Sequence, residues 1–178
     1  MPDMTREQLI QAINDTSVLR GEFTLRSGRK SNYYIDKYRF ATRPDVLREI
    51  GRLMAEHAHE LNVDRIAGAE LGGVPLAAAA AMAAEKPFVL IRNQKKEYGT
   101  AKQMEGELKE GERVLLVEDV LTTGGQVLEA AKTLTDAGAT VARIVAVIDR
   151  MEGARQNIEG AGYEMAALVT TNDLGLTA

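Results

Sequence analysis

Glu118 and Asp119 are adjacent carboxylates that follow the apolar run at 114–117, and the sequence Thr-Thr-Gly-Gly follows at 122–125. Ionised carboxylates only accept hydrogen bonds, so a pair of them suits the hydroxyl groups of a sugar. Glycines at the start of a helix let backbone N–H groups approach an anion closely, and the helix dipole favours negative charge there. The stretch therefore predicts a site for a ribose phosphate.

Two commoner phosphate loops do not fit this stretch. It lacks the G-x-x-x-x-G-K-[ST] pattern of nucleoside triphosphatases and the G-x-G-x-x-G pattern of dinucleotide-binding folds. A simpler interpretation is that Glu118 and Asp119 only cap or pair with neighbouring cations, and that residues 122–125 form a plain turn. The combination of apolar strand, acidic pair, loop and helix start favours the ribose phosphate site.

The stretch VLLVEDVLTTGG at 114–125 resembles the 5-phosphoribosyl-1-diphosphate (PRPP) signature of the type I phosphoribosyltransferases. The resemblance implies that the acidic pair contacts the ribose hydroxyls and that the following loop binds the 5′-phosphate. The predicted PRPP-binding residues are Glu118, Asp119, Val120, Leu121, Thr122, Thr123, Gly124, Gly125 and Gln126, together with Arg92, Lys96 and Tyr98.

Three further stretches resemble the orotate phosphoribosyltransferases. They are GEFTLRSGRKSNYYID at 21–36, AELGGVPLAAA at 69–79 and VIDRMEGARQNIEGAGYE at 147–164. The resemblance implies transfer of the 5-phosphoribosyl group from PRPP to orotate, giving orotidine 5′-monophosphate and diphosphate in de novo UMP biosynthesis. One alternative function is that of a purine or xanthine phosphoribosyltransferase. Another is that of a PRPP-sensing regulator without activity, which could bind RNA. A generic Rossmann-like binding domain is a more distant one.

Arg150 is the residue expected to select the base. It follows the apolar run at 140–149, and a guanidinium binds a planar carboxylate such as that of orotate at two points. By resemblance, Thr122 and Arg26 also belong to the orotate-binding residues, with the N-terminal segment forming a hood over the base. The simpler interpretation of Arg150 is a surface salt bridge with Asp149 or Glu152.

The polar segment at 93–110 is similar to the mobile catalytic loop of the family. The resemblance implies that Arg92 and Lys96 contact the diphosphate in a neighbouring subunit's site, so a homodimer that shares this loop is expected. Lys96, Arg92 and Asp119 are the predicted catalytic residues. The alternative is a β-hairpin flap or a surface loop without a function, since loops of this length are uncommon in compact domains.

Several positions differ from the better-known bacterial pattern. Tyr98 stands where a His is common, Asn93 and Arg26 where a Lys is common, and Leu71-Gly72 where Tyr-Lys is common. The loop is therefore less positively charged than usual. By resemblance, Tyr98 is expected to act only as a hydrogen-bond donor to the diphosphate.

Mg²⁺ is the expected cofactor, held by the diphosphate of PRPP rather than directly by protein ligands, with a water-mediated contribution from Glu118 and Asp119. The expected partners are PRPP and orotate. A formal net charge of −4 argues against a general nucleic-acid binder. The longest apolar run, Val74 to Ala84, is 11 residues long and so falls short of the ~20 that span a bilayer.

The elements that must position these residues alternate between strand and helix from residue 64 onward. Near-continuous apolar strands between amphipathic helices predict a doubly wound, mostly parallel α/β sheet, with a helix and a small hood at about 1–40, in one domain over 1–178. Two short strands are expected within 23–40, around a Ser-Gly turn, and a helix from Pro44. Strands are expected at 65–70, 87–92, 113–119, 140–150 and 163–170, and helices at 74–85, 126–138 and 154–159.

The sequence contains no cysteine, which excludes disulfides, a thiolate nucleophile and cysteine-based metal sites. The N-terminus is polar and charged and lacks the apolar stretch of a secretory signal. A cytoplasmic location is therefore expected. His57 and His59 lie two residues apart on a predicted helix, so they face different sides and are both expected to be solvated, without a metal role.

Overall fold

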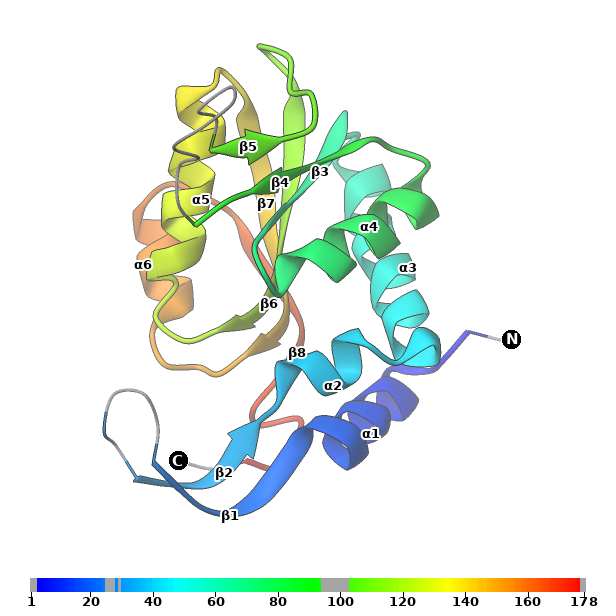
Figure 1. The fold of residues 1–178 in the computed structure, drawn as a ribbon, viewed down its shortest axis with the longest axis vertical. Helices are drawn as coiled ribbons and strands as arrows, with labels where there is room; N and C mark the ends of the chain where they lie inside the picture. The colour runs from blue at the N-terminus through cyan, green and yellow to red at the C-terminus, as the bar shows by residue number, and fades with distance from the viewer. Residues whose placement is uncertain (1–2, 25–27, 29, 94–102, 177–178) are drawn as a thin grey trace.

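A six-stranded sheet forms the centre of the protein (Figure 1). The computed structural model describes residues 3–24, 28, 30–93 and 103–176. The strands lie in the order β5-β4-β3-β6-β7-β8. All neighbouring pairs are parallel except β4 and β5, which are antiparallel. The strand bounds are Arg65–Ala69 for β3, Phe88–Ile91 for β4, Met104–Glu105 for β5, Arg113–Leu121 for β6, Thr140–Asp149 for β7 and Met165–Thr170 for β8.

Helices cover both faces of this sheet, as Figure 1 shows. On one face lie α3 (Pro44–Glu60) and α4 (Gly73–Ala84), and on the other lie α5 (Gly125–Asp136) and α6 (Ala154–Gly160). Each face has its own apolar cluster, the first including Leu115 and Val117 of β6 and the second Val114 and Leu116. This alternation along one strand is the period of two that a sheet imposes. It confirms the doubly wound, mostly parallel arrangement.

Several helix boundaries follow from local capping signals. Thr5 and Gln8 form a capping box at the start of α1 (Arg6–Ser17), and Pro44 opens α3. Gly138, with φ +87°, follows the C-terminal end of α5 and allows the chain to turn there. Within the described residues, no helix combines the length and hydrophobicity needed to cross a membrane.

The N-terminal hood consists of α1, α2 (Lys37–Ala41) and the antiparallel strands β1 (Val18–Thr24) and β2 (Lys30–Ile35). It projects from one end of the sheet in Figure 1, next to the C-terminal segment. Asp173 of that segment forms an ion pair with Arg6 of α1, at 2.8 Å. The C-terminal segment therefore helps to hold the hood in place.

Two expectations about elements were wrong in detail. The second hood strand was expected to continue to residue 40, but it ends at Ile35 and α2 follows. Phe40 and Ala41 of α2 are buried in the apolar cluster beneath α3, and this packing favours a helix over a longer strand. The segment at 93–110 contains a strand in its described part, because Met104 and Glu105 pair with β4. The end of this segment therefore pairs with β4 as in a β-hairpin, which was one of the alternatives for this segment.

Candidate active site

The acidic pair lies inside β6 and not after it. The strand was expected to end at Asp119, but its pairing with β7 continues to Leu121, which lies opposite Asp149. The exposed fractions of Glu118 and Asp119 are 9% and 2%. Successive residues of a strand point to opposite sides, so the two carboxylates leave the strand in different directions.

The loop after β6 is the segment that was predicted to form an anion cradle. It runs from Thr122 to Gly124, and α5 begins at Gly125. The first amides of α5 have no acceptor within the helix, so they are available to an anion. Two carbonyl groups fix the loop on α6: that of Thr122 accepts from the Ala154 amide at 3.1 Å, and that of Thr123 accepts from Asn157 Nδ2 at 2.8 Å.

Gly124 is required by this docking of the loop on α6. Its φ is +82°, a conformation that residues with a side chain rarely adopt. A Cβ atom at this position would also lie 3.2 Å from Cγ1 of Ile158. The glycine thus permits both the turn and the close contact with α6.

The cradle and the acidic pair line one cavity of about 240 Å³. The residues that line it are Lys37, Glu118, Asp119, Val120, Leu121, Thr122, Thr123, Gly124, Gly125, Gln126 and Val127. All nine residues predicted from Glu118 to Gln126 therefore lie together. Lys37 was not predicted to be part of the site.

Burial and the neighbouring charge of Asp119 raise the pKa of Glu118. One oxygen of Glu118 accepts from the Asp119 amide at 2.9 Å. Asp119 in turn forms an ion pair with Lys37, whose Nζ lies 2.8 Å from Oδ2. Burial alone would lower the pKa of Lys37, but the ion pair with Asp119 and the charge of Glu118 outweigh burial and raise the pKa. Lys37 thus partly offsets the negative charge of the acidic pair Glu118 and Asp119.

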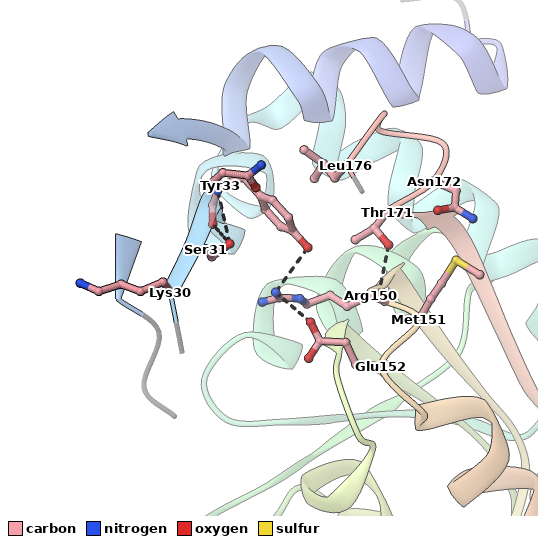
Figure 2. Close-up of a pocket in the computed structure, with 10 residues that line it drawn as sticks. Lys30, Ser31, Tyr33, Arg150, Met151, Glu152, Thr171, Asn172 and Leu176 are labelled. Carbon is pink, nitrogen blue, oxygen red and sulfur yellow. Dashed lines mark hydrogen bonds and ion pairs between the residues drawn. The ribbon is translucent and has the colours of Figure 1, made fainter. Parts of the chain in front are cut away.

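Arg150 lines a second cavity, of about 480 Å³, between the hood and the C-terminal segment (Figure 2). Its guanidinium lies 5.5 Å from the centre of the Tyr33 ring and donates to the Tyr33 hydroxyl at 3.4 Å. The lining residues are Lys30, Ser31, Asn32, Tyr33, Arg150, Met151, Glu152, Thr171, Asn172 and Leu176. A cavity lined by both polar and apolar side chains, with one guanidinium held in place, suits a small planar anion.

The alternative interpretation of Arg150, a surface salt bridge with Asp149 or Glu152, is correct about the contact with Glu152. Nη2 of Arg150 forms an ion pair with Oε1 of Glu152 at 2.9 Å. A dashed line marks this contact in Figure 2. The Arg150 side chain is only 12% exposed, however, so this is not a surface salt bridge. Its Nε atom is buried and has no hydrogen-bond partner among the described residues. One N–H of the guanidinium is thus available to a ligand.

Arg92 does not line the first cavity but lines a separate small pocket that also includes Gln126. It follows β4, and its Nη1 lies 3.3 Å from Oε1 of Glu105. The adjacent Asn93 accepts from Gln126 Nε2 at 3.0 Å, which connects the start of the predicted catalytic loop to the anion cradle. The predicted residues Lys96, Tyr98 and Arg26 lie outside the described residues.

Two residues that line the cavities, Tyr33 and Lys37, were not predicted as site residues. The expectation for His57, which lines neither cavity, was wrong. Tyr33 lay within a quoted stretch, and the alternation of buried Tyr33 and Ile35 in β2 was a signal that could have identified it. Lys37 had no such signal, because its role depends on how the hood packs. His57 is not fully solvated, since Arg143 Nη1 lies 2.9 Å from its Nδ1. Burial and the charge of Arg143 lower the pKa of His57.

The geometry can bind a phosphorylated sugar and a planar anion side by side. The Arg150 amide donates to the Leu121 carbonyl at 2.9 Å, so the second cavity adjoins the loop of the first. No group of three or more His, Cys, Asp or Glu side chains in the described ranges could hold a metal ion. Glu118 and Asp119 nevertheless offer the oxygen ligands that Mg²⁺ prefers, which fits an ion carried in by an anionic ligand.

Comparisons with known proteins agree with this geometry. A family model described as a phosphoribosyl transferase domain matches residues 39–161. The orotate phosphoribosyltransferase of Pyrococcus furiosus is 48% identical over 172 residues, which cover 95% of this chain and 94% of that protein. For the orotate phosphoribosyltransferase of Methanocaldococcus jannaschii, the identity is 43% over 173 residues, covering 97% of this chain and 98% of that protein.

A solved structure is similar over nearly the same extent. It is the orotate phosphoribosyltransferase of Mycobacterium tuberculosis H37Rv in complex with PRPP, with a TM-score of 0.82 and 34% identity. The match covers 96% of this chain and 99% of that chain.

Proposed function

Because this chain belongs to the phosphoribosyl transferase family, and its relatives over nearly the whole chain are orotate phosphoribosyltransferases, we propose that its two adjoining cavities bind PRPP and orotate. The chain transfers the 5-phosphoribosyl group from PRPP to orotate, a step of de novo pyrimidine (UMP) biosynthesis. The products are orotidine 5′-monophosphate and diphosphate. The observation that carries this proposal is the position of the buried Arg150 guanidinium beside the loop of the ribose phosphate cavity.

In the PRPP cavity, each part of the ligand has a chemical counterpart. Glu118 and Asp119 accept hydrogen bonds from the ribose hydroxyls, and the amides and hydroxyls of residues 122–126 bind the 5′-phosphate. These groups are fixed by β6 and by the contacts of the loop with α6. Because they are fixed before the ligand binds, they position the anomeric carbon without further ordering.

In the base cavity, Arg150 binds the carboxylate of orotate. Its free Nε and the Nη groups lie on one guanidinium, and this geometry favours two parallel hydrogen bonds to a carboxylate. Thr122 lies at the junction of the two cavities and contacts the base as well. Arg26 is assigned to the same site by resemblance alone, since it lies outside the described residues.

The reaction breaks the bond between the anomeric carbon and the diphosphate oxygen and forms a bond to the orotate ring nitrogen. Positive charge builds on the ribose ring and negative charge on the leaving diphosphate. Lys96 and Arg92 neutralise that leaving group, and Tyr98 donates to it, in a site from which water is excluded. Mg²⁺ on the diphosphate would supply further charge neutralisation when bound, with Glu118 and Asp119 oriented toward it through water.

A homodimer that shares the catalytic loop between subunits is part of this proposal. It rests on the resemblance of the segment at 93–110 to the catalytic loop of the family. A cytoplasmic location is also proposed, because the sequence contains no cysteine that could form a disulfide.

The proposal is tested by measuring diphosphate release from PRPP with orotate, uracil, adenine and xanthine in parallel, with and without Mg²⁺. We expect release with orotate in the presence of Mg²⁺ and little with the three bases that lack a carboxylate. Comparable release with adenine or xanthine would instead support a purine phosphoribosyltransferase. RNA binding without turnover of any base would support a regulator.

A further inference from the structure

Lys37 projects from the hood into the PRPP cavity. It is the first residue of α2, and its ammonium lies 2.8 Å from Oδ2 of Asp119. The Lys37 side chain is 39% exposed, whereas that of Asp119 is 3% exposed. Among the described residues that line this cavity, Lys37 is the only one with a positive charge. The two carboxylates of the cavity therefore have one resident counter-charge from the described chain.

The other side of the Asp119 carboxylate is closed by backbone. Gly72, which precedes α4, lies so close that a Cβ atom there would be 1.4 Å from Oδ2 of Asp119. No side chain at position 72 can therefore approach this oxygen. Within the described part of the chain, the cation that pairs with Asp119 comes from the hood, where Lys37 supplies it.

The hood does not depend on Lys37 to stay in place. Phe40 and Ala41 of the same helix are buried in the apolar cluster, with exposed fractions of 0% and 2%. Ile35, at the end of β2, is buried in the same cluster. A purely structural tether at position 37 would thus add little to a contact that apolar burial already makes.

The Lys37 ammonium forms an ion pair with Asp119 Oδ2, and this oxygen is buried without a hydrogen-bond partner among the described residues. An ammonium group carries three N–H donors, so a partly exposed one in an acidic cavity can direct donors to an anionic ligand. An unpaired Asp119 at 3% exposure would repel that ligand and lose its fixed orientation. The ion pair therefore affects both the position of Asp119 and the charge that PRPP meets.

We propose that Lys37 is a positioning residue for PRPP, which holds the Asp119 carboxylate toward the ribose and offsets its charge as the phosphorylated ligand enters. This inference rests on the proposed function, because it assigns PRPP to the cavity. It predicts that loss of Lys37 weakens the binding of the phosphorylated sugar and leaves the base site unchanged.

The test compares Lys37→Met and Lys37→Arg with the parent protein. The control is Arg39→Met on the same helix, since Arg39 is 54% exposed and pairs with Asp36. Steady-state assays give the KM for PRPP and for orotate, and calorimetry gives the affinity for ribose 5-phosphate, used as the probe. Lys37→Met should raise the KM for PRPP roughly 10-fold to 100-fold, the loss expected for a charge-assisted hydrogen bond.

The KM for orotate and the melting temperature should stay at parental values in Lys37→Met, and Lys37→Arg should recover part of the PRPP affinity. In an Asp119→Asn background, Lys37→Met should cost less than in the parent, because the charge it offsets is gone. If Lys37→Met fails to fold, the KM for PRPP and the affinity for ribose 5-phosphate are compared between Lys37→Gln and Lys37→Arg instead. Lys37→Gln should then show the weaker binding.

Parental PRPP and ribose 5-phosphate affinities in Lys37→Met would overturn the inference, and so would an equal rise of both KM values. A parent protein that releases no diphosphate with orotate would instead count against the proposed function. Calorimetry with ribose 5-phosphate would still report on Lys37 in that case.

Discussion

The Arg150 amide donates to the Leu121 carbonyl at 2.9 Å, and this bond joins the end of β7 to the loop that follows β6. The two strands are neighbours in the sheet, and ligands of open α/β sheets bind at the carboxyl ends of such strands. The base cavity and the PRPP cavity are therefore held in a fixed relation by backbone. A base bound by Arg150 lies next to the ribose without any rearrangement of the sheet.

Arg150→Ala is expected to weaken the binding of orotate. The substitution removes a charge-assisted hydrogen bond worth ~1.5–3 kcal/mol, so the KM for orotate should rise by roughly 10-fold to 100-fold. The KM for PRPP should change much less. Arg155→Ala is the matched control, because Arg155 is exposed on α6 and its partners in the described part of the chain, Glu159 and the Met165 carbonyl, line neither cavity. An unchanged KM for orotate in Arg150→Ala would remove Arg150 from the base site.

Lys96→Ala is expected to slow the chemical step. The loss of one preorganised donor to the leaving group should lower kcat by ~10²–10³-fold, while the KM for PRPP is less affected. Single-turnover measurements of diphosphate release separate this effect from product release. Lys132→Ala, on the exposed face of α5, serves as the control. Turnover of Lys96→Ala at the parental rate would show that the loop assignment is wrong.

Gly72→Ala is expected to displace the Asp119 carboxylate. The new Cβ atom would lie 1.4 Å from Oδ2, so one of the two groups must move. A displacement of about 1 Å in a positioning group can cost on the order of 10²-fold in rate, and we expect a loss of that size in kcat/KM for PRPP. Gly160→Ala has open space around its Cβ and should keep parental activity. Equal activities of the two variants would contradict the packing described for Gly72.

Glu118 should make the use of PRPP dependent on pH. Burial and the charge of Asp119 raise the pKa of Glu118 above its ordinary value of 4.5. Ribose hydroxyls donate to the ionised form, so kcat/KM for PRPP should rise with pH up to this raised pKa and then level off. The pH profile of Glu118→Gln should lack that limb. If the limb persists unchanged in Glu118→Gln, another group produces it.

The same shift in pKa affects stability. A carboxyl group with a raised folded pKa binds more protons in the folded state than in the unfolded state. The free energy of unfolding therefore falls as the pH rises from about 4.5 through the raised pKa. Glu118→Gln should be more stable than the unliganded parent at the upper end of this range. Thermal unfolding of both proteins at several pH values measures the difference, and parallel curves would contradict it.

The cradle could be predicted from the sequence because its parts are adjacent in the chain. A buried strand, an acidic pair and a helix start at 114–126 already determine which groups face one another. The position of Arg150 beside the cradle could be predicted for a similar reason, since it follows a strand whose neighbour carries the cradle. In both cases, the local pattern and the rules of parallel sheets are sufficient.

Lys37 and His57 could not be predicted in this way. Whether Lys37 reaches Asp119 depends on how the hood packs on the sheet, a contact between segments far apart in sequence. α2 is also too short to show helical periodicity, so residue 37 was assigned to a strand. His57 is half-buried because Arg143 of β7 reaches the end of α3, and no pattern within α3 indicates that partner.

The most direct test of the account is a crystal structure of the protein with orotidine 5′-monophosphate. We predict that the 5′-phosphate lies within about 3 Å of the amides at 123–126 and that the ribose faces Glu118 and Asp119, with the base carboxylate on Arg150. Electron density for the phosphate outside this loop, or a base carboxylate that does not contact Arg150, would contradict the account.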